Sequence, residues 1–144
     1  MSAAFRLITP GNYDELFALW SSIPGMGMRG LDDSCEGIKK FLRRNPDTCF
    51  AAVDGKIIGC ILCGNDGRRG YIYHACVLPE YRGQGVGSEL VRLCCEALKA
   101  EGIKKCALVC YSSNDLGNKF WQSKQWELRT DLNYYNMSLD ENNI

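Results

Sequence analysis

The chain lacks the features that mark several large classes of protein. Its 17 basic and 17 acidic residues cancel, so no long-range field draws it toward nucleic acid or an anionic membrane. No apolar run is long enough to span a bilayer, and the first residues lack the apolar core of a signal sequence. We find no repeat, linker or low-complexity tract in the 144 residues. These absences favour a single domain over residues 1–144 and predict a cytoplasmic location.

Histidine is nearly absent, with His74 alone, whereas cysteine is abundant, with nine residues. Most of the cysteines stand within apolar runs, where a free thiol behaves as a small core hydrophobe. A secreted disulfide scaffold would be smaller and richer in loops. Cys60 and Cys63 have zinc-like spacing, but in a strand they face opposite sides, and no second pair completes a tetrahedral set. The sequence therefore predicts reduced, mostly buried thiols and no bound metal.

The apolar pattern predicts a mixed α/β chain. Strands are expected over residues 5–8, 48–53, 56–63, 71–77, 106–110, 126–128 and 134–139. Helices are expected from a cap at Asn12, from a cap at Asp33 up to Pro46, over 85–101, and over 114–124. Asp54-Gly55 is a strong signal for a two-residue hairpin. Because a helix joins strand 71–77 to strand 106–110, these two strands are expected to be parallel.

The most informative segment is the glycine-rich turn between strand 71–77 and the helix that follows it. It contains Arg82, Gly83, Gly85 and Gly87. The first N–H groups of a helix have no partner inside the helix, and the macrodipole makes that end partly positive. Glycines let a phosphate approach the backbone, and an arginine fork suits phosphate oxygens. The turn therefore predicts a site for a phosphorylated ligand.

The segment does not match three other kinds of glycine-rich turn: the dinucleotide-binding turn, the P-loop and a turn without a ligand. A dinucleotide-binding unit would place its third glycine one position later and an acidic residue after the next strand. A P-loop would carry lysine and then serine or threonine after the last glycine, whereas this chain has Ser88-Glu89. A tight turn with no ligand would not need both an arginine and three alternating glycines.

The stretch from Val77 to Gly87 resembles the acetyl-CoA signature of the GNAT superfamily of N-acetyltransferases, Gln/Arg-x-x-Gly-x-Gly/Ala. Arg82, Gly85 and Gly87 match that pattern. A supporting match is Asn114-x-x-Gly117-x-x-Phe120-Trp121, and the expected order of elements is also that of the family. The resemblance implies the GNAT fold, a mixed and mostly antiparallel sheet with helices on both faces. Its fourth and fifth strands, which are parallel, splay apart.

The resemblance also implies that acetyl-CoA is the co-substrate. Its diphosphate is expected on the backbone of residues 82–88, and its pantetheine arm between strands 71–77 and 106–110. The backbone N–H near Val77 is expected to polarise the thioester carbonyl. The predicted cofactor-binding residues are Val77, Arg82, Gly83, Gln84, Gly85, Val86, Gly87, Ser88, Asn114, Phe120 and Trp121.

Transfer of an acetyl group to an amine benefits from a base, because an alkylammonium with a pKa of about 10.4 is mostly protonated at pH 7. Tyr71, Tyr73 and His74 are the candidates. Strict alternation along a strand would put the two tyrosines on one face and His74 on the other, so that only one set faces the thioester.

A general acid for the departing thiolate is harder to find. Many GNAT enzymes place a tyrosine seven residues after the motif asparagine, but this chain has Trp121 there. Tyr73, Tyr134 and Tyr135 remain as possible substitutes for this acid. Together with the candidate base of the preceding paragraph, the predicted catalytic residues are Tyr73, His74 and Tyr134. An acyl-cysteine on Cys76 or Cys110 is less favoured than direct transfer.

Residues 23–33 form the expected lip of the acceptor site, where Asp32 and Asp33 either attract a cationic amine or cap a helix. The sequence thus predicts a GNAT-type acyltransferase, with acyl groups other than aminoacyl, that moves acetyl to a primary amine of a small molecule. An acetyltransferase of protein N-termini or lysines, a non-catalytic acyl-CoA-binding module and a nucleotide-binding regulator are the alternatives. The expected partners are coenzyme A and the amine, without nucleic acid or membrane, and a homodimer is left open.

Overall fold

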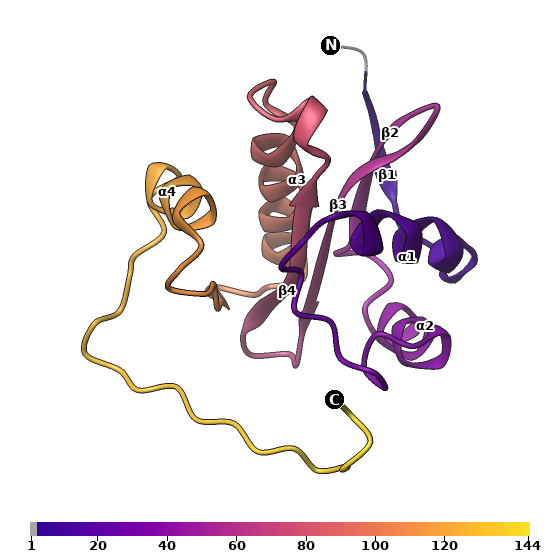
Figure 1. Cartoon of the computed structure of the whole chain (residues 1–144). Helices are drawn as coiled ribbons and strands as arrows, with labels where there is room; N and C mark the ends of the chain where they lie inside the picture. The colour runs from indigo at the N-terminus through magenta and orange to yellow at the C-terminus, as the bar shows by residue number, and fades with distance from the viewer. Residues whose placement is uncertain (1–2) are drawn as a thin grey trace.

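A five-stranded sheet, in the order β1-β2-β3-β4-β5, forms the centre of the computed structural model, which describes residues 3–144 (Figure 1). The first four strands pair antiparallel, and β5 pairs with β4 in parallel, as the sequence predicted. The strands are β1 (Ala4–Leu7), β2 (Phe50–Asp54), β3 (Lys56–Asn65), β4 (Gly70–Val77) and β5 (Cys106–Leu108).

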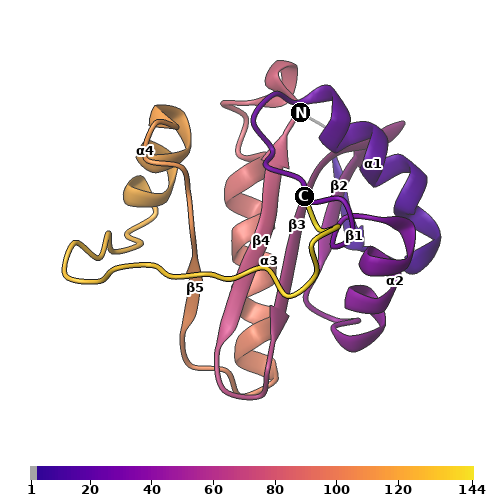
Figure 2. The same ribbon diagram turned by 60° about the horizontal axis from the view of Figure 1, so that its bottom comes forward.

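Helices cover both faces of this sheet. α1 (Tyr13–Ser22) and α2 (Cys35–Arg44) lie on one face and α3 (Val86–Ala100) on the other, while α4 (Asp115–Ser123) lies beyond β5 (Figures 1 and 2). Short 3-10 turns, η1 (Pro10–Asn12) and η2 (Pro79–Tyr81), precede α1 and α3. β3 is buried over most of its length, because both layers of helices pack on it. The predicted fold class is therefore confirmed.

The helix starts show one confirmed and one wrong prediction. Asn12 is the N-cap residue of α1 as expected, and its side-chain amide donates to Glu15 Oε1 at 3.1 Å rather than capping a backbone N–H. Asp33 does not cap α2, because the cap is Ser34, whose Oγ accepts a hydrogen bond from the N–H of Gly37 at 3.1 Å. The carboxylate of Asp33 is thereby left for another partner, which belongs to the site described below.

The two strands expected after α4 are absent from the structure. Residues 126–128 and 134–139 form no ladder, and residues 127–144, which we call the C-terminal tail, run back across the molecule to the loop between α1 and α2 (Figure 2). Outward side chains of the tail are exposed, Tyr135 to 85% and Leu139 to 95%. A strand needs a neighbour with free N–H and C=O groups, whereas the end of this tail is held by hydrogen bonds to residues 30–32.

The nine cysteines occupy three environments. The structure buries Cys49, Cys60, Cys63 and Cys94, half-buries Cys76, Cys95, Cys106 and Cys110, and exposes Cys35. The buried ones lie in the core, where Cys60 Sγ accepts a hydrogen bond from the indole N–H of Trp20 at 3.3 Å. They pack as small hydrophobes, as the sequence predicted. Among the described helices, none is both long and apolar enough to cross a membrane.

Candidate active site

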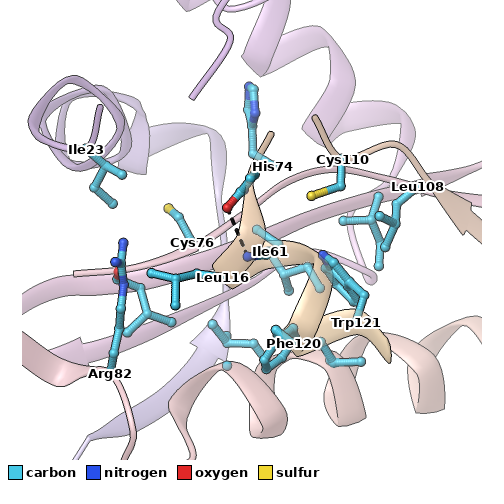
Figure 3. A pocket seen from close by; sticks show the side chains of 18 of the residues that line it. Ile23, Ile61, His74, Cys76, Arg82, Leu108, Cys110, Leu116, Phe120 and Trp121 are labelled. Atoms are coloured by element: carbon cyan, nitrogen blue, oxygen red, sulfur yellow. Dashed lines mark hydrogen bonds between the residues drawn. The ribbon is translucent and has the colours of Figure 1, made fainter. Parts of the chain in front are cut away.

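The site lies in an opening between β4 and β5. The two strands pair only from Gly70 to Ile72 on β4, and β4 continues to Val77 with no strand on that side. A cavity of about 810 Å³ fills the opening, lined by β4, β5, the start of α3, α4 and the chain just after α1. In the view of Figure 3, Arg82 lies on one side of this cavity and Leu108 on the other, with His74 at the top.

The strand pairing directs backbone groups of β4 into this opening. Leu78 N–H donates to the carbonyl of Ile58 at 2.8 Å, so this pair is a hydrogen-bonded one. In an antiparallel ladder the hydrogen-bonded and non-hydrogen-bonded pairs alternate, so Val77 and Ala75 turn their N–H and C=O groups away from β3. The Nε–H of Arg82 donates to Val77 O at 3.0 Å on that side. An extended ligand that enters the opening therefore meets strand-like backbone groups.

The start of α3 forms the other end of the site. Gly83 and Gly85 have φ of +77° and +85°, and a Cβ on either would meet no atom within 4 Å. The turn therefore keeps the space in front of the helix open, while the N–H groups of the first turn of α3 lack intrahelical partners. Gly87 serves packing instead, because a Cβ there would come within 3.3 Å of the Phe120 ring. The geometry suits an anion at the positive end of α3.

Almost all of the predicted cofactor-binding residues gather around the cavity. Val77, Arg82, Gly83, Gly85, Val86, Gly87, Ser88, Asn114, Phe120 and Trp121 line it. Gln84 does not, because its side-chain amide donates to Glu80 O at 3.4 Å. Asn114 caps α4 by accepting from the N–H of Gly117 at 2.9 Å. Trp121 packs edge to face against Phe120 and Trp126, with centroids 5.1 and 5.0 Å away.

A β-bulge in β4 changes which side chains share a face. His74 pairs with Leu62 while Ile72 pairs with Cys63, so Tyr73 is the extra residue. The Tyr73 ring packs against Phe41 of α2, and the His74 ring lies 4.9 Å from Trp20 of α1. Strict alternation predicts opposite faces for these two side chains, and that prediction is wrong. A bulge places two consecutive residues opposite one, and here both face the layer of α1 and α2.

His74 is paired with a carboxylate that the sequence did not connect to it. Its Nε2 lies 2.6 Å from Oδ1 of Asp33, and the two side chains are only 10% and 8% exposed. The other oxygen of Asp33, Oδ2, accepts from the N–H of Arg29 at 2.6 Å. Asp33 and His74 stand 41 positions apart in the sequence, so no local pattern could have predicted the pair.

Similarity to known proteins decides the family. The sequence model described as "Acetyltransferase (GNAT) family" matches residues 13–125 of the chain. The protein belongs to the GNAT acetyltransferase family. This confirms the resemblance seen in the glycine-rich turn, and with it acetyl-CoA as the acyl donor. An acetyltransferase of Sodalis glossinidius is 29% identical over 128 residues, which cover 88% of this chain and 89% of that protein.

Solved structures share the fold of this GNAT protein at low sequence identity. Ard1 from Thermoplasma volcanium superposes with a TM-score of 0.75 at 17% identity, covering 86% of this chain and 82% of that one. AAC(6')-Iy, in complex with the bisubstrate analogue CoA-S-monomethyl-acetylneamine, gives a TM-score of 0.74 at 19% identity, covering 96% and 99%. At these identities the likeness establishes the fold only.

The tyrosines near the GNAT site are suited to donate hydrogen bonds rather than to act as bases. Burial, followed by the neighbouring phenol of Tyr134, raises the pKa of Tyr71 to about 12. Burial and then the charge of Asp32 raise the pKa of Tyr73. Both phenols therefore stay protonated at neutral pH, which removes them as candidate bases. Tyr73 lines the cavity, whereas Tyr134 lies beside Tyr71 and does not line it.

The two cysteines considered as nucleophiles both line the cavity, and Figure 3 shows them at its edge. Burial raises the pKa of the Cys110 thiol, which lowers its thiolate content. Cys76 Sγ lies 4.0 Å from Cys60 Sγ. Within the part of the chain that the structure describes, no three His, Cys, Asp or Glu side chains are arranged to hold a metal ion. The raised pKa makes the Cys110 thiol a poor nucleophile, which favours direct transfer over an acyl-cysteine at this residue.

Proposed function

We propose that this GNAT acetyltransferase transfers the acetyl group of acetyl-CoA directly to a primary amine of a small molecule. The observation that carries the proposal is the opening between β4 and β5, where the backbone of Ala75 and Val77 faces a cavity that ends at the start of α3. A strand-like thioester arm with a diphosphate at one end matches both features.

The donor end of the cavity fits coenzyme A residue by residue. The open space before Gly83 and Gly85 would hold a diphosphate against the N–H groups of α3. Arg82, whose Nε–H donates to Val77 O, would bind the diphosphate through its other guanidinium nitrogens. The pantetheine amides would pair with Ala75 and Val77, as a further strand would. The Val77 N–H would then donate to the thioester oxygen, where negative charge develops during attack.

The acceptor end of the cavity supplies the groups for proton transfer. Ile23 to Met26, Tyr73 and His74 line that end. Among these side chains the imidazole of His74 is the usual kind of general base. Tyr73 is better placed than Tyr134 to protonate the departing thiolate, because it lines the cavity. We assign His74 as the base and Tyr73 as the acid.

A small acceptor is favoured over a protein because the loop after α1 borders the acceptor end and the C-terminal tail holds that loop in place. The loop after α1 lines the cavity, and the C-terminal tail is hydrogen-bonded to the same loop at residues 30–32. A structural neighbour binds an analogue that joins CoA to monomethyl-acetylneamine, an example of a small amine acceptor on this fold. We also infer one domain and a reducing compartment such as the cytoplasm, in keeping with nine free thiols.

The test is the release of coenzyme A thiol from acetyl-CoA in the presence of a panel of acceptors. The panel contains small diamines, aminosugars and amino acids together with peptides that carry a free N-terminus or a lysine. Turnover with at least one small amine, and weaker turnover with the peptides, supports the proposal. Binding of acetyl-CoA without turnover of any amine would instead identify a non-catalytic acyl-CoA-binding module, and preference for the peptides a protein acetyltransferase.

A further inference from the structure

We propose that Asp33 is the positioning residue for acetyl transfer, because it fixes the tautomer of His74. The inference rests on the proposed function and assigns the chemistry of its acceptor end. Asp33 keeps the ring proton on Nε2, and this leaves Nδ1 as the one nitrogen that can take a proton from the amine.

The contact between the two side chains defines the tautomer. Nε2 and Oδ1 are 2.6 Å apart, which is short for a nitrogen–oxygen hydrogen bond and typical of one with an ionised partner. A carboxylate can only accept hydrogen bonds, so Nε2 must donate. In a neutral imidazole the other nitrogen then carries the lone pair. Among the described residues, Asp33 is the only hydrogen-bond partner of the ring.

The surroundings of Asp33 hold its carboxylate in place for this task. Its Oδ2 accepts from the N–H of Arg29, while its own N–H donates to the carbonyl of Arg29 at 3.0 Å. Its backbone carbonyl accepts from the hydroxyl of Tyr13 at 2.7 Å. These contacts occupy Oδ2 and the backbone, so Oδ1 remains for His74. A buried carboxylate with both oxygens hydrogen-bonded keeps the imidazole of His74 in one orientation.

The ring itself is fixed from the other side. Trp20 packs against it, and the indole N–H of Trp20 is already engaged with Cys60, so it does not compete for a ring nitrogen. His74 lines the cavity, whereas Asp33 does not, so Asp33 acts through His74 rather than on the substrate.

The ammonium nitrogen of the acceptor loses two protons during acetyl transfer. Nδ1 of His74 takes one proton from the bound ammonium, and the freed amine nitrogen forms a bond to the acyl carbon. The bond between carbon and sulfur breaks, Tyr73 gives its phenolic proton to the thiolate, and the phenol regains a proton from the second N–H of the nitrogen. His74 then returns its proton to solvent.

A first experiment reads the tautomer directly. Because His74 is the only histidine, nitrogen-15 labelling of histidine in protein made without a polyhistidine tag gives the signals of this ring alone. At a pH where the ring is neutral, we expect the proton on Nε2. Asp33→Asn presents an amide that can donate to Nε2, so we expect the proton to move to Nδ1. A wild-type ring with its proton on Nδ1 would overturn the proposal, whatever the activity measurements show.

A second experiment separates positioning from folding and from substrate binding. We expect Asp33→Asn to lower kcat by roughly 10²-fold, the usual contribution of a positioned base, and to leave the affinity for acetyl-CoA within about twofold. The same change at an exposed carboxylate, Asp14→Asn, should leave kcat unaltered. In a His74→Gln background, Asp33→Asn should lower kcat by less than about twofold, since its partner is already gone.

Two outcomes would contradict the role of Asp33. One is a kcat of Asp33→Asn within about twofold of wild type; the other is an equal loss in the presence and absence of His74. A wild-type protein that acetylates no amine would instead refute the proposed function, and the labelled ring would still report whether Asp33 sets the tautomer.

Discussion

The donor and acceptor ends of the cavity are built in opposite ways. The donor end comes mainly from one continuous stretch, residues 77–88, whose glycines and backbone amides face the opening. The acceptor end brings together α1, the loop before α2, the bulge in β4 and the C-terminal tail, which are far apart in sequence. Local backbone geometry therefore defines the donor end, whereas long-range contacts define the acceptor end. The difference predicts that changes at each end alter different kinetic parameters.

The largest effect is expected from removing the backbone donor that faces the thioester. Val77→Pro deletes an N–H that the ladder with β3 does not use, so the sheet should survive. Loss of one such donor lowers kcat by about 10²–10³-fold in comparable sites. Steady-state kinetics with acetyl-CoA measures this loss. Cys76→Pro is the control, since its N–H bonds to β3 and its loss should unfold the sheet in thermal melting.

If Val77→Pro melts like wild type and keeps its kcat, then the N–H of Val77 is not the oxyanion donor. If it melts as low as Cys76→Pro, then the ladder with β3 does use that N–H, and the amide does not face the cavity.

The next effect concerns the phosphate end alone. Gly85→Asp puts a carboxylate where the diphosphate should lie, and we expect the affinity for coenzyme A to fall about 100-fold, or nearly 3 kcal/mol. Because Gly85 has a positive φ, any side chain there is strained. Gly85→Asn is therefore the matched control, since asparagine has the same size, tolerates that conformation and carries no charge. Calorimetry in which both variants bind equally would show that charge at this turn is irrelevant.

A smaller effect at the acceptor end tests the role of the C-terminal tail. Asn143 accepts hydrogen bonds from the N–H groups of Leu31 and Asp32 through Oδ1, and donates from its amide to Asp32 Oδ2. Asn143→Ala removes these contacts from the loop that carries Asp33. Because they are exposed, we expect KM for the amine to rise about threefold while the affinity for acetyl-CoA stays unchanged. A change in acetyl-CoA affinity of equal size would mean that the two ends are not independent.

The smallest effect is expected at the position of the usual family tyrosine. Trp121→Tyr restores a phenol in the cavity wall and should leave kcat equal or somewhat higher, within about threefold. Trp121→Phe controls for the smaller ring, since it lacks the hydroxyl. A large loss in both variants would show that Trp121, which packs edge to face against Phe120 and Trp126, shapes the coenzyme A site through packing.

The sequence by itself predicted the order of the elements through α4, the parallel pairing of β4 with β5, and the glycine-rich turn at the donor end. These follow from short-range rules: hairpin and helix-start residues, apolar periodicity, and glycines that only a left-handed turn requires. Of the eleven cofactor-binding residues, which these rules and the family resemblance together predicted, ten lie on the cavity wall, the exception being Gln84.

Only the tertiary structure decided the acceptor end. The bulge that turns Tyr73 and His74 to one face arises from pairing with β3, and no residue in β4 marks it. The alternating pattern of residues 134–139 predicted a strand, but alternation cannot say whether a partner edge is present, and the structure leaves this segment extended and exposed. The bond between Asp33 and His74 joins residues 41 positions apart. Its physical basis is burial, because the sheet and α1 remove both side chains from water and a buried polar group needs a hydrogen-bond partner.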